Sequence, residues 1–454
     1  MYNKNDILKL NILDMSLEGK GIAKTEDGYT LFVDGAVVGD EVNAKITKTN
    51  KTYGFAKTVE ITEKSPFRVV PGCSVSHMCG GCTLSEITYA KQLEIKNNIV
   101  KNNLSKIGGL KDDEYISEDI IPSPLTEGYR NKAQYPVALV KGRAIAGFYE
   151  RKSHNVTECK NCVIQSQKIN RVISLCVKFL NDWKISIYDE KSHRGIVRSI
   201  YVREGYESMM VCMVTNSEKP LKNADRLIEM LKEENVTSII QNINTKKTNV
   251  VLGDKNIVLW GDEFIKEKIG NLIFEVSPLS FYQVNSSQVQ NLYDKAKEYA
   301  GITENDTVFD LYCGVGTIGL YMADKAKKLI GVEIVNDARD NAERNAKNNG
   351  INNAEFYAGD CGKVVRELVN KGERADIVMV DPPRKGCSEE VIDLLSEINP
   401  RKIVYISCNS ATLARDAALL KEKGYRMSKC TPVDMFPNTA HVECVVLLCR
   451  GGKI

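Results

Sequence analysis

The C-terminal part of the chain alternates short apolar runs with polar turns and helical stretches, and this rhythm constrains the fold more than any other feature. Five apolar runs follow residue 265, each with a turn and in most cases a helix after it: 307–312, 328–334, 354–360, 376–382 and 402–407. Strand, turn and helix repeated in this order build a parallel sheet with helices on both faces. We therefore predict a Rossmann-like α/β domain over 261–454.

The N-terminal region has a different pattern. A chain of 454 residues is too long for one hydrophobic core, so further domains are expected. Residues 1–62 contain short alternating runs separated by glycine turns, which is typical of a small β-barrel. Ser65-Pro66 and Pro71-Gly72 interrupt this pattern and mark its end.

The stretch between the barrel and the α/β domain has a mixed pattern. Residues 85–104 have the apolar spacing of one long helix, which we expect to pack on the C-terminal domain. Strand-like runs then alternate with helices near 166–181 and 221–234. We therefore predict a small α+β domain over 63–260 between the barrel and the α/β domain.

A glycine loop follows the first strand of the α/β domain. The segment Asp310-Leu-Tyr-Cys-Gly-Val-Gly-Thr-Ile-Gly319 spaces its glycines as a dinucleotide-binding turn does, and Glu333 ends the next strand. Glycine lets the backbone approach a ligand, and a carboxylate at the end of the second strand can bind ribose hydroxyls. This loop alone fits either a nicotinamide cofactor or S-adenosylmethionine.

Two acidic positions favour S-adenosylmethionine over a nicotinamide. Asp360 follows the third strand, where a methyltransferase would place the adenine amino group. Asp381 opens the turn Asp381-Pro-Pro-Arg384 after the fourth strand, at the mouth of the sheet where open α/β folds bind ligands. We therefore predict a methyltransferase.

The fifth strand ends in Ser407-Cys408-Asn409, which places a thiol at the same mouth. Amino-methyltransferases usually carry Tyr or Phe after their Pro-Pro turn, whereas Arg384 stands here. Carbon 5 of uracil becomes nucleophilic once a thiolate adds to carbon 6, and a base must then remove the carbon 5 proton. We predict Cys408 as this nucleophile and Glu443 as the base. Their ordinary alternatives are a packing thiol and a surface carboxylate.

Fourteen cysteines are many for a chain without a disulfide-permitting secretion signal, so catalysis, metal binding and core packing must share them. Cys313, inside the glycine loop, is a rival nucleophile that we expect to pack beside the cofactor and face away from the base. Five others form a knuckle and a downstream pair: Cys73, Cys79, Cys82, Cys159 and Cys162. Four such thiolates suit either zinc or an iron–sulfur cluster.

Basic residues gather locally, although the net charge is only +3. Residues 43–59 contain four lysines and no acid, interleaved with Tyr53 and Phe55. Residues 128–153 contain six lysines or arginines against Glu150 alone. Such patches suit a nucleic-acid path, although most single runs of this kind are solvated faces.

Several segments together resemble the RNA (uracil-5-)-methyltransferases that act on 23S ribosomal RNA and tRNA, over nearly the whole chain. The segments are Ser280-Phe-Tyr-Gln-Val-Asn285, Asp310-Leu-Tyr-Cys-Gly-Val-Gly-Thr317, Asp381-Pro-Pro-Arg-Lys-Gly386, Ser407-Cys-Asn and Phe436-Pro-Asn-Thr-Ala-His-Val-Glu443. The resemblance implies a class I methyltransferase domain, an OB-like TRAM barrel that binds RNA, and methylation of uridine carbon 5 by S-adenosylmethionine.

The resemblance also implies roles for particular residues. Cys408 matches the family nucleophile and Glu443 its general base. Six residues match positions that contact S-adenosylmethionine: Gln283, Tyr312, Thr317, Glu333, Asp360 and Asp381. Ser410 departs from the family, in which Pro commonly follows Ser-Cys-Asn, and we expect it to loosen this turn.

Relatives with the same cysteine pattern carry a [4Fe–4S] cluster. The resemblance therefore implies a set of four ligands that omits Cys159: Cys73, Cys79, Cys82 and Cys162. Because the knuckle lies far in sequence from Cys408, we expect the cluster to hold the central domain together and to shape an RNA surface.

The barrel and the knuckle favour 23S ribosomal RNA as the substrate, with tRNA as the alternative and with the target uridine flipped out of its stack. Two other classes are a cytosine or amino-methyltransferase and a non-catalytic RNA-binding protein, and the intact Cys408 and Glu443 argue against the latter. No apolar run is long enough to span a bilayer, and the N-terminus lacks the pattern of a secretory signal. We expect a cytoplasmic monomer.

Overall fold

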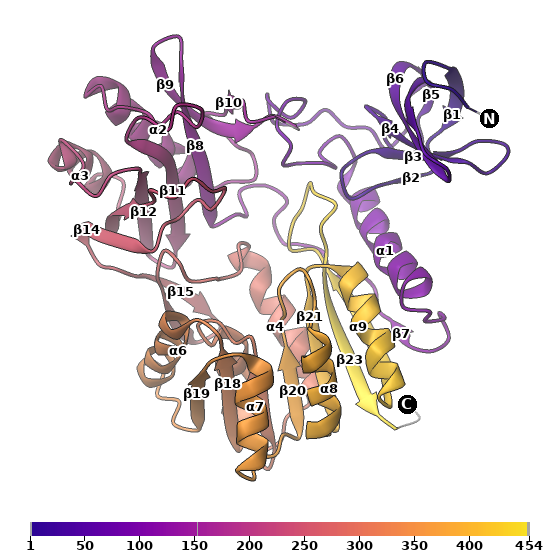
Figure 1. Ribbon diagram of the computed structural model, residues 1–454, viewed down its shortest axis with the longest axis vertical. Helices are drawn as coiled ribbons and strands as arrows, with labels where there is room; N and C mark the ends of the chain where they lie inside the picture. Colours follow the sequence, from indigo (N-terminus) through magenta and orange to yellow (C-terminus); the bar gives the residue numbers. More distant parts are fainter. Residues whose placement is uncertain (1, 152, 452–454) are drawn as a thin grey trace.

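Three large β-sheets organise the chain over residues 2–151 and 153–451, which the computed structural model describes (Figure 1). The first sheet belongs to the N-terminal β domain, the second to the middle of the chain and the third to the C-terminal domain. Within these residues no helix is long and apolar enough to cross a membrane.

The N-terminal β domain has six strands in the order β1-β5-β6-β4-β3-β2. Its strands are β1 (Ile7–Asn11), β2 (Asp14–Met15), β3 (Gly21–Lys24), β4 (Thr30–Asp34), β5 (Glu41–Thr49) and β6 (Tyr53–Glu63). Val42, Ala44 and Ile46 alternate along β5 and are all buried, so one face of the strand forms the core. The predicted β domain is confirmed.

The central domain is a seven-stranded sheet in the order β10-β9-β8-β11-β12-β13-β14. Its elements are β8 (Lys132–Val140), β9 (Arg143–Tyr149), β10 (Val156–Glu158), α2 (Gln167–Asp182), β11 (Val197–Gly205), β12 (Ser208–Thr215), α3 (Ala224–Lys232), β13 (Ser238–Ile243) and β14 (Lys255–Gly261). Helix α3 is shorter than predicted because Asn223 takes a left-handed conformation and ends the preceding loop. The mixed α+β architecture agrees with the prediction.

The C-terminal domain begins with the hairpin β15 (Ile265–Ile269) and β16 (Leu272–Val276), followed by α4 (Ser286–Ala300). All five predicted strands are present and pair in parallel: β17 (Thr307–Leu311), β18 (Lys328–Glu333), β19 (Ala354–Ala358), β20 (Ile377–Val380) and β21 (Lys402–Ser407). The helices between and after them are α5 (Thr317–Met322), α6 (Asn336–Asn348), α7 (Cys361–Asn370), α8 (Glu389–Ile398) and α9 (Ser410–Glu422). The Rossmann-like α/β fold is confirmed.

The eight-stranded sheet has the order β19-β18-β17-β20-β21-β23-β22-β7. Strand order reverses between β17 and β20, which is where such sheets bind ligands at their carboxyl ends. The strands β22 (Tyr425–Val433) and β23 (Glu443–Arg450) form an antiparallel pair, and β23 runs antiparallel to β21 with Ser407 opposite Cys444. The first residue of β23 therefore lies at the carboxyl end of β21.

Helix α1 (Tyr89–Lys106) joins the N-terminal half of the chain to the C-terminal domain, and Figure 1 shows it beside α9. Val100 and Leu104 of α1 lie in the same hydrophobic core as the sheet. The helix begins four residues later than the predicted Ser85, because Leu84 and Thr88 are held in a turn by backbone hydrogen bonds to Asn438 and Phe67. A short strand, β7 (Ile116–Ser117), then adds to the edge of the sheet beside β22.

Candidate active site

The glycine loop after β17 depends on backbone conformations and close contacts that only glycine allows easily. Gly314 and Gly316 have φ values of 55° and 83°, in the left-handed region that favours glycine. A Cβ atom on Gly319 would lie 2.7 Å from Oδ2 of Asp310, so the helix α5 can approach β17 only with glycine there. The Gly319 amide donates a 2.9 Å hydrogen bond to that carboxylate.

Glu333, at the end of β18, has its carboxylate fixed by the backbone. Its Oε2 accepts a 3.0 Å hydrogen bond from the Gly314 amide, and its Oε1 accepts a 2.9 Å hydrogen bond from the Val335 amide. Tyr312 precedes the loop with a φ of 64°, an unfavourable conformation for tyrosine that marks local strain beside the sheet mouth.

The segment 280–285 brings Gln283 to the same mouth. Arg203, fully buried in β11, donates to the Ser280 carbonyl at 3.2 Å, and the Asn131 side chain donates to the Gln283 carbonyl at 2.9 Å. The Gln283 side chain is buried and borders the cavity described below. Residues of the central domain thus fix a segment of the C-terminal domain.

The turn that carries Cys408 lies between β21 and α9. The Ser407 hydroxyl accepts a 3.1 Å hydrogen bond from the Asn409 amide, and the Asn409 side chain caps α9 by accepting one from Ala411. Asn409 also donates to the Arg384 carbonyl at 3.0 Å, which ties this turn to the Pro-Pro turn. Ser410 accepts a 2.8 Å hydrogen bond from Asn103 of α1. This contact ties the turn to α1 and therefore acts against the loosening of the turn that we expected at Ser410.

Three side chains meet at the carboxyl ends of the central strands: Cys408 after β21, Asp381 after β20, and Glu443 at the start of β23. Burial, followed by the charge of Asp381, raises the pKa of Glu443 to about 8, and the neighbouring Arg384 opposes this shift. Burial alone raises the pKa of Asp381 to about 7. The Cys408 thiol has a pKa raised to about 11 by burial and by the two carboxylates, again against the effect of Arg384. The Cys408 thiol and two carboxyl groups with raised pKa values therefore border the same cavity.

A cavity of about 870 Å³ opens between these side chains and the central domain. It is bordered by Gln283, Tyr312, Glu333 and Asp381, which are four of the six predicted cofactor residues, and by Cys408 and Glu443. Glu443 is almost fully buried, and its Oε2 has no hydrogen-bond partner in the described part of the chain. An unpaired buried carboxylate oxygen at a cavity wall is a position that a bound ligand can complete.

The other two predicted cofactor residues lie outside the cavity wall. Thr317 is buried at the start of α5 and shares a 3.0 Å hydrogen bond with Tyr293. Asp360 is exposed and caps α7 by accepting from the Lys363 amide. The rival nucleophile Cys313 packs in the core beneath the glycine loop and does not border the cavity, as predicted.

The cysteine knuckle borders the same cavity, although it lies far from Cys408 in sequence. All five of these cysteines line the wall: Cys73, Cys79, Cys82, Cys159 and Cys162. The packing of the central domain on the sheet mouth brings them there. Among the described residues, no group of three or more His, Cys, Asp or Glu side chains is placed to hold a metal ion.

Sequence patterns did not identify several residues of the cavity wall as site residues. Arg130 and Lys132 lie in the basic stretch found in the sequence, but nothing there indicated that they would border the same cavity as Cys408. Burial, followed by the charges of Arg203 and Arg130, lowers the pKa of Lys132 to about 7. Four further aromatic side chains line the wall: Phe148, Phe281, Phe436 and His441. A basic and aromatic wall suits an unstacked nucleotide.

Comparison with known proteins identifies the class. Residues 88–451 match the tRNA (Uracil-5-)-methyltransferase family, and residues 4–59 match the TRAM domain. An uncharacterised RNA methyltransferase of Clostridium tetani is 44% identical over 99% of this chain and 97% of its own length. Another from Oceanobacillus iheyensis is also 44% identical, over 98% of this chain and 97% of its own length.

A solved structure has the same architecture. The tRNA (uracil-54, C5)-methyltransferase of Pyrococcus abyssi, in complex with S-adenosyl-L-homocysteine, superposes with a TM-score of 0.76. It is 28% identical and covers 97% of this chain and 100% of its own. The chain therefore belongs to the tRNA (Uracil-5-)-methyltransferase family, as a TRAM-containing, S-adenosylmethionine-dependent enzyme that methylates carbon 5 of uracil in RNA.

Proposed function

We propose that Cys408 is the nucleophile and Glu443 the general base of this methylation, and that the substrate is a uridine in 23S ribosomal RNA. The observation that carries the assignment of the two residues is the antiparallel pairing of β21 with β23. Ser407 lies opposite Cys444, so Cys408 and Glu443 both project from the same end of the sheet into one cavity.

The chemistry follows from the two side chains. The Cys408 thiolate adds to carbon 6 of the uracil, which forms an S–C bond and makes carbon 5 nucleophilic. S-adenosylmethionine supplies the methyl group that carbon 5 takes up. Glu443 then removes the proton from carbon 5, and the electron pair of that C–H bond expels the Cys408 thiolate. The raised pKa of Glu443 suits a base that must hold and release this proton.

Six residues are proposed to hold S-adenosylmethionine: Gln283, Tyr312, Thr317, Glu333, Asp360 and Asp381. The fixed carboxylate of Glu333 and the open backbone at Gly314 support this proposal, since ribose hydroxyls can donate to the carboxylate and a ligand can approach the backbone closely. Asp360 caps α7 and leaves its other lone pairs available to an adenine amino group.

The knuckle is proposed to bind a [4Fe–4S] cluster through Cys73, Cys79, Cys82 and Cys162. Thiolates are the ligands that such clusters require, and these thiols face one cavity. A four-iron cluster takes up more space between its ligands than a single ion does. Cys162, followed by Val163-Ile164-Gln165, is favoured over Cys159 because it is the position that matches the fourth ligand in the relatives with this cysteine pattern.

The division into domains is proposed at 1–62, 63–260 and 261–454, because each part carries its own large sheet. The enzyme would act in the cytoplasm, where its RNA lies. The presence of a TRAM barrel together with a cysteine knuckle supports 23S RNA. The second candidate is tRNA, because the enzyme from Pyrococcus abyssi covers 97% of this chain.

The substrate is tested with RNA from a strain that lacks the gene. Purified 23S RNA and purified tRNA from that strain are each incubated with the enzyme and S-adenosylmethionine carrying a labelled methyl group. We expect label in 5-methyluridine of the 23S RNA only. Label in the tRNA fraction alone would replace the ribosomal proposal with the tRNA one.

The nucleophile is tested by trapping. RNA that contains 5-fluorouridine has no proton to lose at carbon 5, so the elimination step stops and the enzyme stays linked to the RNA. We expect a denaturation-stable adduct with the natural protein and none with Cys408→Ala. The matched control Cys176→Ala changes a buried thiol in α2 outside the cavity and should still form the adduct. An undiminished adduct with Cys408→Ala would contradict the assignment.

A further inference from the structure

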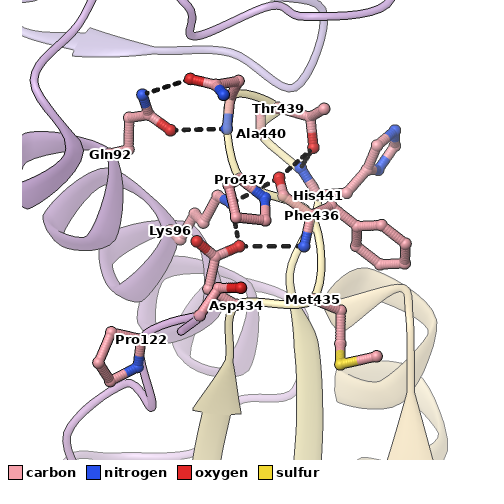
Figure 2. A network of polar contacts seen from close by, with 12 residues as sticks. Gln92, Lys96, Pro122, Asp434, Met435, Phe436, Pro437, Thr439, Ala440 and His441 are labelled. Carbon is pink, nitrogen blue, oxygen red and sulfur yellow. Dashed lines mark hydrogen bonds and ion pairs between the residues drawn. The ribbon is translucent and has the colours of Figure 1, made fainter. Parts of the chain in front are cut away.

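The loop between β22 and β23, residues 434–441, separates the cavity from helix α1, and we call it the wall loop. Phe436, Thr439 and His441 of the wall loop border the cavity. Figure 2 shows the Phe436 and His441 rings pointing to one side of the loop, while Lys96 and Asp434 lie on the other. The ring centroids of Phe436 and His441 are 6.2 Å apart with an interplanar angle of 77°, an edge-to-face pair.

Behind the rings, an ion pair joins the wall loop to α1. Lys96 and Asp434 both have fully buried side chains and contact each other directly. Lys96 also donates to the Phe436 carbonyl at 3.0 Å, and the Asp434 carboxylate accepts from the Phe436 amide at 3.1 Å. The Tyr89 hydroxyl donates to Asp434 at 2.9 Å. The backbone of Phe436 is thus held through both its amide and its carbonyl.

Three further residues hold the rest of the wall loop through hydrogen bonds. Gln92 of α1 accepts a 2.8 Å hydrogen bond from the Asn438 amide and donates to the Asn438 side chain at 3.2 Å. The Tyr129 hydroxyl donates to the Pro437 carbonyl at 2.9 Å. The Ala440 amide donates to the Thr83 hydroxyl at 3.1 Å. None of Thr83, Gln92 and Tyr129 belongs to the sheet that carries Cys408.

A fully buried ion pair is a poor source of net stability, because two charges must leave water before they can pair. Apolar side chains of similar volume would fill this space at no greater cost in folding free energy. An apolar pair, however, could not accept a hydrogen bond from the Phe436 amide and donate one to the Phe436 carbonyl. The pair therefore sets the position of Phe436 more than it stabilises the fold.

We propose that Lys96 and Asp434 are positioning residues, which hold the wall loop so that Phe436 and His441 form one side of the pocket for the extruded uridine. This inference rests on the proposed function. Single unstacked bases are held by stacking on aromatic side chains, and a ring displaced by about 1 Å can lower the rate a hundredfold. Glu443 follows His441 by two residues, so the contacts that hold the wall loop also help to position the Glu443 carboxylate.

The test uses the full chain with Lys96→Met and Asp434→Asn together, which removes both charges and leaves no unpaired one buried. We expect the double variant to bind S-adenosyl-L-homocysteine like the natural protein in calorimetry, since the cofactor residues do not contact the pair. Its KM for RNA should rise and its rate of adduct formation with 5-fluorouridine RNA should fall, each by about tenfold. The control Lys101→Met removes an exposed lysine from the same helix and should change none of these values.

A double variant with unchanged KM and adduct rate would overturn the inference, even if its melting temperature fell, because the pair would then be only structural. An equal loss in S-adenosyl-L-homocysteine affinity would also overturn it, since the damage would be general. Should the double variant not fold, Phe436→Leu tests the same wall, with a raised KM for RNA expected and an unchanged KM contradicting it. No adduct with the natural protein would instead overturn the proposed function, and this inference with it.

Discussion

Glu443 has surroundings very different from those of a free carboxyl side chain. Its carboxyl group is buried beside Asp381 and Arg384, and its pKa is raised to about 8. Burial, followed by the charges of Glu443 and Asp381, raises the pKa of the Cys408 thiol to about 11. Loss of a proton from either group is therefore opposed by the other, and Arg384 is the cation that favours both ionised forms.

At this scale we predict the effect of Glu443→Gln. The amide cannot take the proton from carbon 5, so product release should slow by about 10²-fold to 10⁴-fold. Cys408 still adds to carbon 6, and the methylated RNA should therefore stay linked to the protein. The measurement is gel electrophoresis under denaturing conditions with unmodified RNA, followed by methyl counting. Normal turnover by this variant would contradict the role of Glu443 as the base.

The proposed cofactor site includes the turn between β17 and α5. They approach so closely that the amide of Gly319 donates to the carboxylate of Asp310, whose pKa is raised to about 8 by burial. The φ of Gly319 lies outside the left-handed region, so glycine is needed there for space and not for backbone conformation.

We predict that Gly319→Ala weakens binding of S-adenosyl-L-homocysteine. The added Cβ would lie 2.7 Å from the Asp310 carboxylate and 3.0 Å from Leu329, so α5 must shift. Overpacking of this kind costs about 1–3 kcal/mol, and a loss of binding free energy of that size corresponds to a rise of about 5-fold to about 150-fold in Kd by calorimetry. Gly72→Ala makes the same chemical change where the nearest atom is 3.5 Å away and should leave the Kd unchanged. A normal Kd for Gly319→Ala would show that α5 does not set the cofactor site.

At the scale of the whole molecule, the buried acids of the active site lower the stability of the folded state at neutral pH. Three buried acids, Asp310, Asp381 and Glu443, have pKa values raised to about 8, 7 and 8. A raised pKa means that the folded state binds protons more tightly than the unfolded state does. The resulting stability is complete below the unfolded values and is lost as the pH rises through the folded ones.

Glu267, whose pKa burial raises to about 8, acts in the same direction, whereas Lys132, whose pKa burial lowers to about 7, acts in the opposite direction above pH 7. We therefore expect the thermal midpoint of the ligand-free protein to fall as the pH rises from about 5 to about 7. Glu443→Gln removes one of these four acid titrations and should make this fall shallower, while adding stability at the upper end of the range. Differential scanning calorimetry over this range measures both effects. A midpoint that rises with pH, or an identical slope in the variant, would contradict the burial of these acids.

The sequence by itself determined the five parallel strands, the glycine loop and the place of Cys408 at a strand end, since apolar periodicity and glycine spacing are local properties of the chain. Tertiary structure alone decided that Glu443 stands beside Cys408, because the antiparallel direction of β23 depends on which strand it pairs with. It also decided that the cysteine knuckle borders the same cavity and that Lys96 pairs with Asp434, 338 residues away. Contacts of this kind arise from packing between distant segments, and no local pattern of residues encodes them.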